Sequence, residues 1–290
     1  MTSVLPRTVA PAPRAEPVRP SPHPGRAGLL TALLGSAVAL ALAYWASVRT
    51  VTGQRIENAV LLDAQAGRPS APDLAASALG STDIGPWVCA GLLTVLAIGC
   101  ARRRFAAGTA AAGLVVGSLL VARLLKLTLL ARPDLDAGGA VARHNSFPSG
   151  HVSAAVAVLL ALAIVLPHRA RPWVMIPGAV GVGWVAYATV LLGWHRPSDT
   201  VGASLLVVGI CCGTLALRTG FRTDAGAARR SPEATVVALV APALLAGGTY
   251  AAVRLATPDA HSAAGLAGVV SFALVLFVLW LLTPPSTSAA

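Results

Sequence analysis

Charged residues are scarce in this chain. Only 11% of its 290 residues are charged, whereas 56% are hydrophobic. An average soluble domain has roughly 25% charged residues, and a soluble fold of this length could not bury so much apolar surface. The composition therefore excludes an ordinary soluble domain. Together with long uncharged stretches, it predicts an integral membrane protein.

Lysine and cysteine are rare as well. Lys126 is the one lysine, so the formal net charge of +11 comes from arginine. In a membrane protein such an excess marks the cytoplasmic loops, and the chain has no basic, aromatic-interleaved soluble surface, so we expect no nucleic-acid partner. The cysteines lack metal-site spacing and lie in apolar stretches. We interpret all four as small buried hydrophobic residues: Cys89, Cys100, Cys211 and Cys212.

Apolar stretches near the ~20 residues that a bilayer requires recur along the chain. They predict an all-α fold, a polytopic membrane helix bundle with a six-span core and two additional C-terminal spans. The predicted spans are approximately 27–48, 84–101, 105–130, 150–167, 173–194, 199–217, 235–255 and 262–283.

These spans divide the chain into predicted segments. The first segment, 1–25, contains seven prolines and scattered arginines, so it is predicted to be a disordered cytoplasmic tail. The remaining segments are a catalytic core over 26–218, a cytoplasmic linker over 219–234, two transmembrane helices over 235–283 and a tail over 284–290.

Basic residues are distributed unevenly among the predicted loops. With a cytoplasmic N-terminus, thirteen of the 22 lysines and arginines lie on the cytoplasmic side, so both termini are predicted to be cytoplasmic. The longest connection, 49–83, is then extracytoplasmic. Within it, 56–66 either forms an amphipathic helix on the membrane surface, with a lid or access role, or is only a connector.

Three polar segments interrupt the apolar pattern at 126–133, 148–151 and 195–199. The predicted topology places all three on the extracytoplasmic face. Polar and charged groups at membrane depth are costly and mark functional sites. Taken singly, each segment has a plainer interpretation, such as interfacial cations or a helix cap. Their convergence on one face favours catalysis.

The first two segments contain the groups that bind a phosphate. Lys126 supplies a point charge and Arg132 a bidentate fork. Gly150 lets the backbone approach an anion at the start of a helix, where free N–H groups face it, and Ser149 adds a hydroxyl.

The third segment contains a candidate nucleophile. His195 and Asp199 are four residues apart, so the carboxylate can hold one ring nitrogen while the other attacks phosphorus. His151 would protonate the leaving alkoxide and later activate water. This scheme requires no metal, and the same face lacks the carboxylate cluster of a two-metal site. We therefore predict no metal and no other cofactor.

These motifs resemble the type 2 phosphatidic acid phosphatase superfamily, which includes lipid phosphate phosphatases and vanadium-dependent haloperoxidases. The family pattern is Lys-x6-Arg-Pro, then Pro-Ser-Gly-His, then Ser-Arg-x5-His-x3-Asp, and the resemblance covers roughly 126–199. It implies that His195 forms a phosphohistidine, with Asp199 as its partner and His151 as the acid. It also implies a set of phosphate ligands, namely Lys126, Arg132, Ser149 and Gly150.

The sequence departs from the family pattern in the first motif. Five residues separate Lys126 from Arg132, where the family has six. One residue corresponds to ~100° of helix, so we expect Arg132 to reach the site from an unwound segment near Pro133.

A second departure removes a cation. The Ser-Arg pair of the family falls on Ala188 and Thr189, so one phosphate-binding arginine is missing. Arg196, next to the proposed nucleophile, is the preferred replacement and is included among the substrate-binding residues. Arg143 and Arg123 are the alternatives.

The sequence thus predicts a metal-independent phosphatase in the cell membrane, with its site on the extracytoplasmic face. Its substrate would be a lipid-linked phosphomonoester or pyrophosphate, of the phosphatidate, phosphatidylglycerophosphate or polyprenyl pyrophosphate class. The alternatives are a catalytically degenerate lipid-binding or transport protein of the same fold, a haloperoxidase-like enzyme holding vanadate, and phosphotransfer to an acceptor other than water. The lipid, the role of the last two spans and the oligomeric state stay open.

Overall fold

Long apolar stretches of this chain fold into helices, which satisfy their own backbone hydrogen bonds as a bilayer requires. The computed structural model describes residues 25–67, 83–135, 145–220 and 259–282, with a few further residues between 237 and 248. Within these parts the chain is helical with short connections and contains no strand. The predicted all-α fold is confirmed for them. Most or all of the predicted segments 1–25, 219–234, 235–255 and 284–290 lie outside the described residues.

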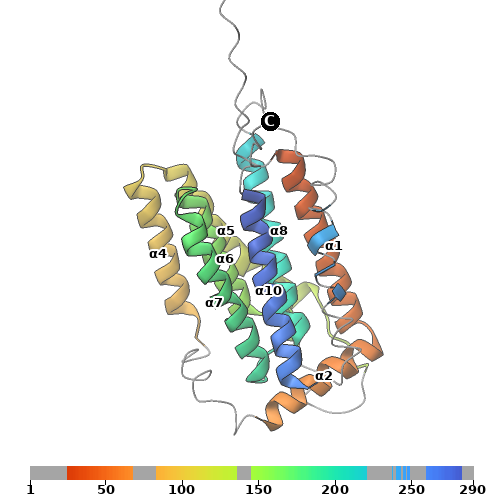
Figure 1. Ribbon diagram of the computed structural model, residues 1–290. Helices are drawn as coiled ribbons and strands as arrows, with labels where there is room; N and C mark the ends of the chain where they lie inside the picture. The colour runs from red at the N-terminus through yellow and green to blue at the C-terminus, as the bar shows by residue number, and fades with distance from the viewer. Residues whose placement is uncertain are drawn as a thin grey trace, which may run out of the picture.

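Most of the described helices run along one common axis (Figure 1). Five are long and apolar enough to cross a membrane, namely α1, α5 with its continuation η2, α7, α8 and α10, while α4 and α6 are shorter apolar helices. The protein is therefore a polytopic helical membrane bundle. The elements in chain order are α1 (Arg26–Val48), α2 (Val51–Ala66), α4 (Gly85–Ala101), α5 (Phe105–Leu124), the π-helix η2 (Leu125–Leu129), α6 (Gly150–Val165), α7 (Arg171–Leu191), α8 (Pro197–Gly220) and α10 (Ala260–Leu282).

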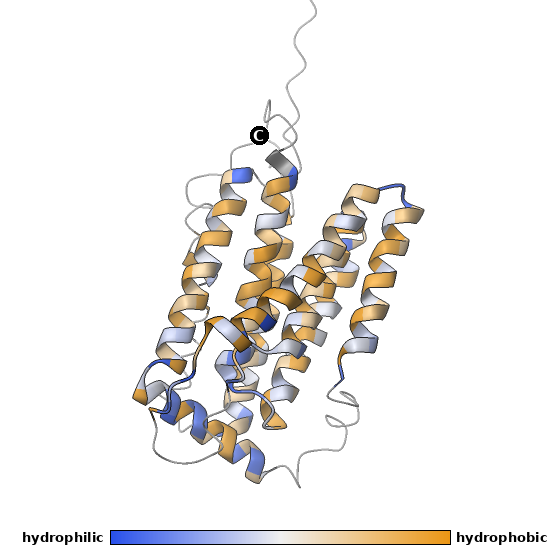
Figure 2. Cartoon of the chain, turned by 180° about the vertical axis from the view of Figure 1, so that it is seen from behind, coloured by the Kyte–Doolittle hydropathy of each residue, from blue (hydrophilic) through white to orange (hydrophobic). Residues whose placement is uncertain are grey.

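The centre of the bundle is formed by α6 and α8. Their apolar side chains are buried on nearly all sides and join residues of α5, α7 and α10 in one hydrophobic core. By contrast, α4 has only Val95 and Gly99 buried, and its Trp87 and Leu93 are largely exposed. Hydrophobic residues cover the lengths of the helices (Figure 2). An apolar outer surface is what a helix facing lipid requires.

The position of α4 corrects one expectation from the sequence. Cys211 and Cys212 of α8 are buried, as predicted, but Cys89 and Cys100 of α4 are exposed. An apolar stretch does not reveal whether its helix lies at the centre or the edge of a membrane bundle, because hydrocarbon and protein core are equally apolar.

The last helix, α10, packs against α7 and α8 inside the same core. Gly183 of α7 and Gly268 of α10 allow the two backbones to approach, since a Cβ at Gly268 would lie 2.8 Å from the carbonyl oxygen of Gly183. Ser204 of α8 donates a hydrogen bond to Ser271 Oγ at 3.0 Å. Small residues and interhelical hydroxyl bonds are common contacts between membrane helices.

The helix α2 lies across the end of the bundle at which α1 finishes (Figure 1). Its N-cap is Thr50, whose side chain accepts a hydrogen bond from Gly53 N at 3.0 Å. The helix therefore begins five residues before the predicted amphipathic segment 56–66. It is packed on the bundle, because Val60 lies in a small core with Val190 and residues of α10.

Substituting Gly268 by alanine tests the contact between α7 and α10. The added methyl group meets a backbone oxygen that cannot rotate away, so we expect a destabilisation of about 1–3 kcal/mol. Gly265→Ala is the matched control on the same helix, because nothing lies within 4 Å of its added Cβ. The measurement is the thermal midpoint in detergent. A midpoint lowered equally by both substitutions would contradict this account of the packing.

Candidate active site

The structure brings the three polar segments together at the end of the bundle that α2 covers. The backbone N–H of Ser149, at the start of α6, donates to the backbone oxygen of Asp199 in α8 at 2.9 Å. The ring centroids of His151 and His195 are 6.1 Å apart. The segment after α5 joins them through Asn145, whose side chain donates to the backbone oxygens of Lys126 at 3.0 Å and Leu130 at 2.7 Å.

Asp199 is fully buried in the first turn of α8. Its Oδ2 lies 3.4 Å from His195 Nδ1 and accepts hydrogen bonds from Ser146 Oγ at 2.5 Å and Arg196 N at 2.8 Å. An acceptor at Nδ1 favours the tautomer with its proton there, which leaves the Nε2 lone pair available. His195 is 8% exposed. The arrangement suits an imidazole that acts as a nucleophile.

A tight turn between α7 and α8 places His195. Gly193 has φ of +63°, in the left-handed region that favours glycine. A Cβ at this position would also lie 2.7 Å from Gln65 Cγ of α2. The turn then closes with a hydrogen bond from His195 N to the backbone oxygen of Thr189 at 3.1 Å.

The start of α6 has the features of an anion site. Ser149 is the N-cap, and its side chain accepts a hydrogen bond from Val152 N. No atom lies within 4 Å of a Cβ built on Gly150, so space is open in front of this backbone. Free N–H groups and the positive end of the helix dipole attract anions at such a position.

Arg132 lies on a non-helical segment, as the shortened first motif predicted. The π-helical turn η2 ends at Leu129, and Leu130 is extended with φ of −107° and ψ of 112°. Gln54 of α2 holds this segment by donating to the backbone oxygen of Pro133 at 2.6 Å. The Arg132 side chain is 9% exposed, and its Nε and Nη1 have no hydrogen-bond partner in the described part of the chain.

The three candidate replacements for the missing arginine differ in position. Arg196 is 2% exposed and donates from Nε and Nη2 to Asn58 Oδ1, and from Nη1 to Ser146 Oγ. Arg123, in the last turn of α5, is exposed. Arg143 lies outside the described residues. Lys126, on η2, is half-buried.

The comparison with known families agrees with these motifs. The family model of the PAP2 superfamily matches residues 104–224. This part of the chain is similar to the PAP2 superfamily. The comparisons with curated proteins and with solved structures gave no match. The resemblance predicted from the motifs is thus confirmed, and the family match suggests a phosphatase-type activity on phosphate esters.

Two residues of α2 contact the PAP2 segment although they lie outside it. Asn58 Oδ1 accepts from Arg132 and Arg196, and Glu57 Oε2 accepts from Ser198 Oγ at 2.7 Å. Neither residue was predicted from the sequence. The available signal was the spacing of Gln54, Glu57 and Asn58, which places three polar side chains on one helical face.

Glu57 is a buried carboxyl group beside the start of α8. Burial raises the pKa of Glu57 to about 7, and the charge of Asp199 acts in the same direction. The hydrogen bond from Ser198 and the charges of Arg132 and Arg196 oppose this rise in pKa. Glu57 is therefore a carboxyl group that gains or loses its proton near neutral pH.

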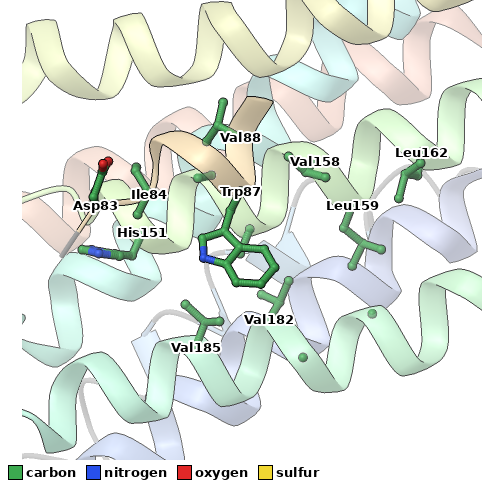
Figure 3. A pocket seen from close by; sticks show the side chains of 14 residues that line it. Asp83, Ile84, Trp87, Val88, His151, Val158, Leu159, Leu162, Val182 and Val185 are labelled. Atoms are coloured by element: carbon green, nitrogen blue, oxygen red, sulfur yellow. The ribbon is translucent and has the colours of Figure 1, made fainter. Parts of the chain in front are cut away.

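An apolar groove begins beside His151 (Figure 3). It has a volume of about 440 Å³ and is lined by residues of α4, α6 and α7, with Asp83 and Ile84 near its polar end. Trp87 extends into it in the close-up view (Figure 3). On the α7 side, Gly181 faces open space, since nothing lies within 4 Å of an added Cβ.

Glu57→Gln tests the buried carboxyl group. Its pKa is 4.5 in the reference state and about 7 in the folded protein. The stability contributed by protonated Glu57 is therefore fully present below about pH 4.5 and is lost as the pH rises through about 7. The difference corresponds to about 3 kcal/mol at most. We expect the thermal midpoint of the unsubstituted protein to fall more than that of Glu57→Gln between about pH 5 and about pH 8. Parallel pH profiles would contradict the assignment.

Proposed function

We propose that this chain is a metal-independent membrane phosphatase that hydrolyses a lipid-linked phosphomonoester or pyrophosphate through a phosphohistidine on His195. The observation that carries the proposal is a juxtaposition at His151. The ring centroids of His151 and His195 are 6.1 Å apart, and His151 also lines the apolar groove. A polar reacting centre and an apolar slot thus meet at one side chain.

The reaction proceeds in two displacements. His195 Nε2 attacks phosphorus while its Nδ1 proton stays hydrogen-bonded to Asp199. The bond from phosphorus to the leaving oxygen breaks, and His151 gives that oxygen its proton. Water then attacks the phosphohistidine, His151 takes the proton of the water, and the N–P bond breaks to release phosphate and neutral His195.

Positive charge and N–H donors hold the phosphate during both steps. Arg132 offers the donors on Nε and Nη1 that no described residue uses, and Lys126 adds a cation from η2. The backbone at Gly150 and the hydroxyl of Ser149 approach from the start of α6. Arg196 adds positive charge beside Arg132 while its own nitrogens bond to Asn58 and Ser146.

The apolar groove supports a lipid as the substrate. It extends along α6 from His151 to Leu162, which at 1.5 Å per residue is about 16 Å. This length is about half of the ~30 Å hydrocarbon core of a bilayer. A chain lying in the groove therefore spans one leaflet, with its phosphate beside His151.

Basic residues at the opposite end of the bundle support the proposed orientation in the cell membrane. Arg102 Nη1 donates to Val165 O at the end of α6 at 3.0 Å, and Arg218 Nη1 donates to Ala106 O at the start of α5. By the positive-inside rule this end faces the cytoplasm. The site then faces the extracytoplasmic side, and both termini are cytoplasmic.

Thr189 favours a second candidate function, a lipid-binding or transport protein of the same fold without turnover. Its side chain is fully buried and donates to the backbone oxygen of Ala186 at 3.1 Å. It therefore supplies no positive charge where the family pattern has an arginine. Binding of a lipid phosphate without any release of phosphate would support this candidate.

Replacing His195 by alanine tests the nucleophile. We expect phosphate release to fall at least ~1000-fold, because the covalent step is lost. The assay uses detergent-solubilised protein with chelator, against phosphatidate, phosphatidylglycerophosphate and polyprenyl pyrophosphate. His168→Ala, between α6 and α7 and away from the site, is the control. Full activity of His195→Ala would exclude the proposed nucleophile, and loss of activity on chelation would exclude the metal-free scheme.

A leucine at Gly181 tests the groove. The larger side chain enters open space and should compete with the lipid chain without disturbing the polar site. We expect kcat/KM for a long-chain substrate to fall about 10-fold or more. The leucine displaces several methylene groups of the lipid chain from the groove, and burial of each contributes ~0.8 kcal/mol. Hydrolysis of a short soluble phosphate ester should stay unchanged. Gly113→Leu, on an exposed position of α5, is the matched control. Equal losses on both substrates would show that the groove does not hold the chain.

A further inference from the structure

Two buried guanidinium groups share one amide oxygen at the end of the bundle. Asn58 Oδ1 accepts from Arg132 Nη2 at 3.3 Å, from Arg196 Nε at 3.2 Å and from Arg196 Nη2 at 3.1 Å. All three side chains are at most 9% exposed. Two like charges brought together away from water repel each other. Burial, and next the charge of Arg196, lower the pKa of Arg132 accordingly.

The nearby carboxylates are engaged elsewhere. Asp199 Oδ2 accepts from Ser146 and from the backbone N–H of Arg196. Glu57 accepts from the hydroxyl and the backbone N–H of Ser198. Arg132 forms no ion pair with a carboxylate of the described residues. A neutral amide therefore holds Arg132 next to Arg196 without cancelling its charge.

The charges around the site suit a phosphate. Lys126, Arg132 and Arg196 are cationic, Asp199 is anionic, and Glu57 is anionic or neutral according to its protonation. With His195 neutral and His151 carrying the proton that it donates, the sum is +2 or +3, and a phosphate monoester carries up to two negative charges. A carboxylate at position 58 would add one negative charge, which lowers this sum by one. It would also pair with both guanidinium groups.

We infer that Asn58 is a positioning residue, which fixes Arg132 beside Arg196 so that the remaining donors of Arg132 face the substrate phosphate. This pair then compensates for the cation that the family pattern places at Thr189. The inference rests on the proposed function, because it assigns the anion held by Arg132 as the phosphate of the substrate. It makes α2, which lies outside the matched PAP2 segment, part of the substrate site.

Asn58→Asp separates positioning from a purely structural role. The substituted carboxylate has the same size and still accepts hydrogen bonds from both arginines, so the thermal midpoint should stay the same or rise. It competes with the phosphate, however. We expect KM for the lipid substrate and the inhibition constant of inorganic phosphate to rise about 10-fold or more, with a smaller change in kcat. A residue that only stabilised the fold would leave both constants unchanged.

Ala59→Asp is the matched control. It adds the same charge at the next residue of α2, on an exposed position, and should leave KM and the inhibition constant unchanged. Asn58→Ala, which removes the acceptor, should also weaken inhibition by phosphate. If turnover is not measurable, binding is tested through the rise in thermal midpoint on adding inorganic phosphate. This rise should be smaller for Asn58→Asp and Asn58→Ala than for the unsubstituted protein.

The outcomes distinguish this inference from the proposed function. Unchanged phosphate inhibition in folded Asn58→Asp and Asn58→Ala would overturn the inference, even with His195→Ala inactive. Full activity of His195→Ala would instead overturn the proposed function, whatever the Asn58 variants show. An equal rise in KM for Ala59→Asp would also overturn the inference, because the effect would then come from added charge alone.

Discussion

Burial of one carboxylate organises this end of the bundle. Asp199 is fully buried, and a buried charge without partners is strongly unfavourable. Protein groups supply its donors: the Ser146 hydroxyl, the backbone N–H of Arg196 and the ring of His195. Its backbone oxygen also receives the N–H of Ser149. One residue thus ties the start of α6, the segment before it and the turn into α8, and its place at the N-terminus of α8 adds the favourable helix dipole.

The helices of the described residues and the motifs were predictable because their signals are local. Apolar stretches of sufficient length define the helices, and the spacing between Lys126 and Arg132 was enough to predict an unwound segment after α5. Asn58 and Glu57 were missed for a physical reason. A polar face on an amphipathic helix predicts water as its neighbour, whereas these side chains contact residues 74 to 141 positions away in the chain. The sequence of α2 does not indicate which distant side chains form hydrogen bonds with its polar face.

The exposure of Cys89 and the packing of α10 show the same limit. Apolar residues satisfy lipid and protein core equally well, so hydropathy predicts that a helix crosses the membrane but not which neighbours it has. The PAP2 match covers α5 to α8, and α2 and α10 lie outside it. These two helices are joined by a hydrogen bond from Ala260 N to Asp63 Oδ2 at 2.8 Å. Helices on both sides of the PAP2 segment in the sequence therefore contact each other in the structure.

The groove beside His151 has a consequence for how products separate. It opens among helices whose outer surfaces are apolar, and its polar end adjoins the site. If the proposed reaction occurs there, the dephosphorylated lipid diffuses sideways into the leaflet from which it came, while inorganic phosphate diffuses into the aqueous phase. The two products then partition into different solvents. Accumulation of the dephosphorylated lipid in the leaflet therefore does not hinder release of phosphate into water.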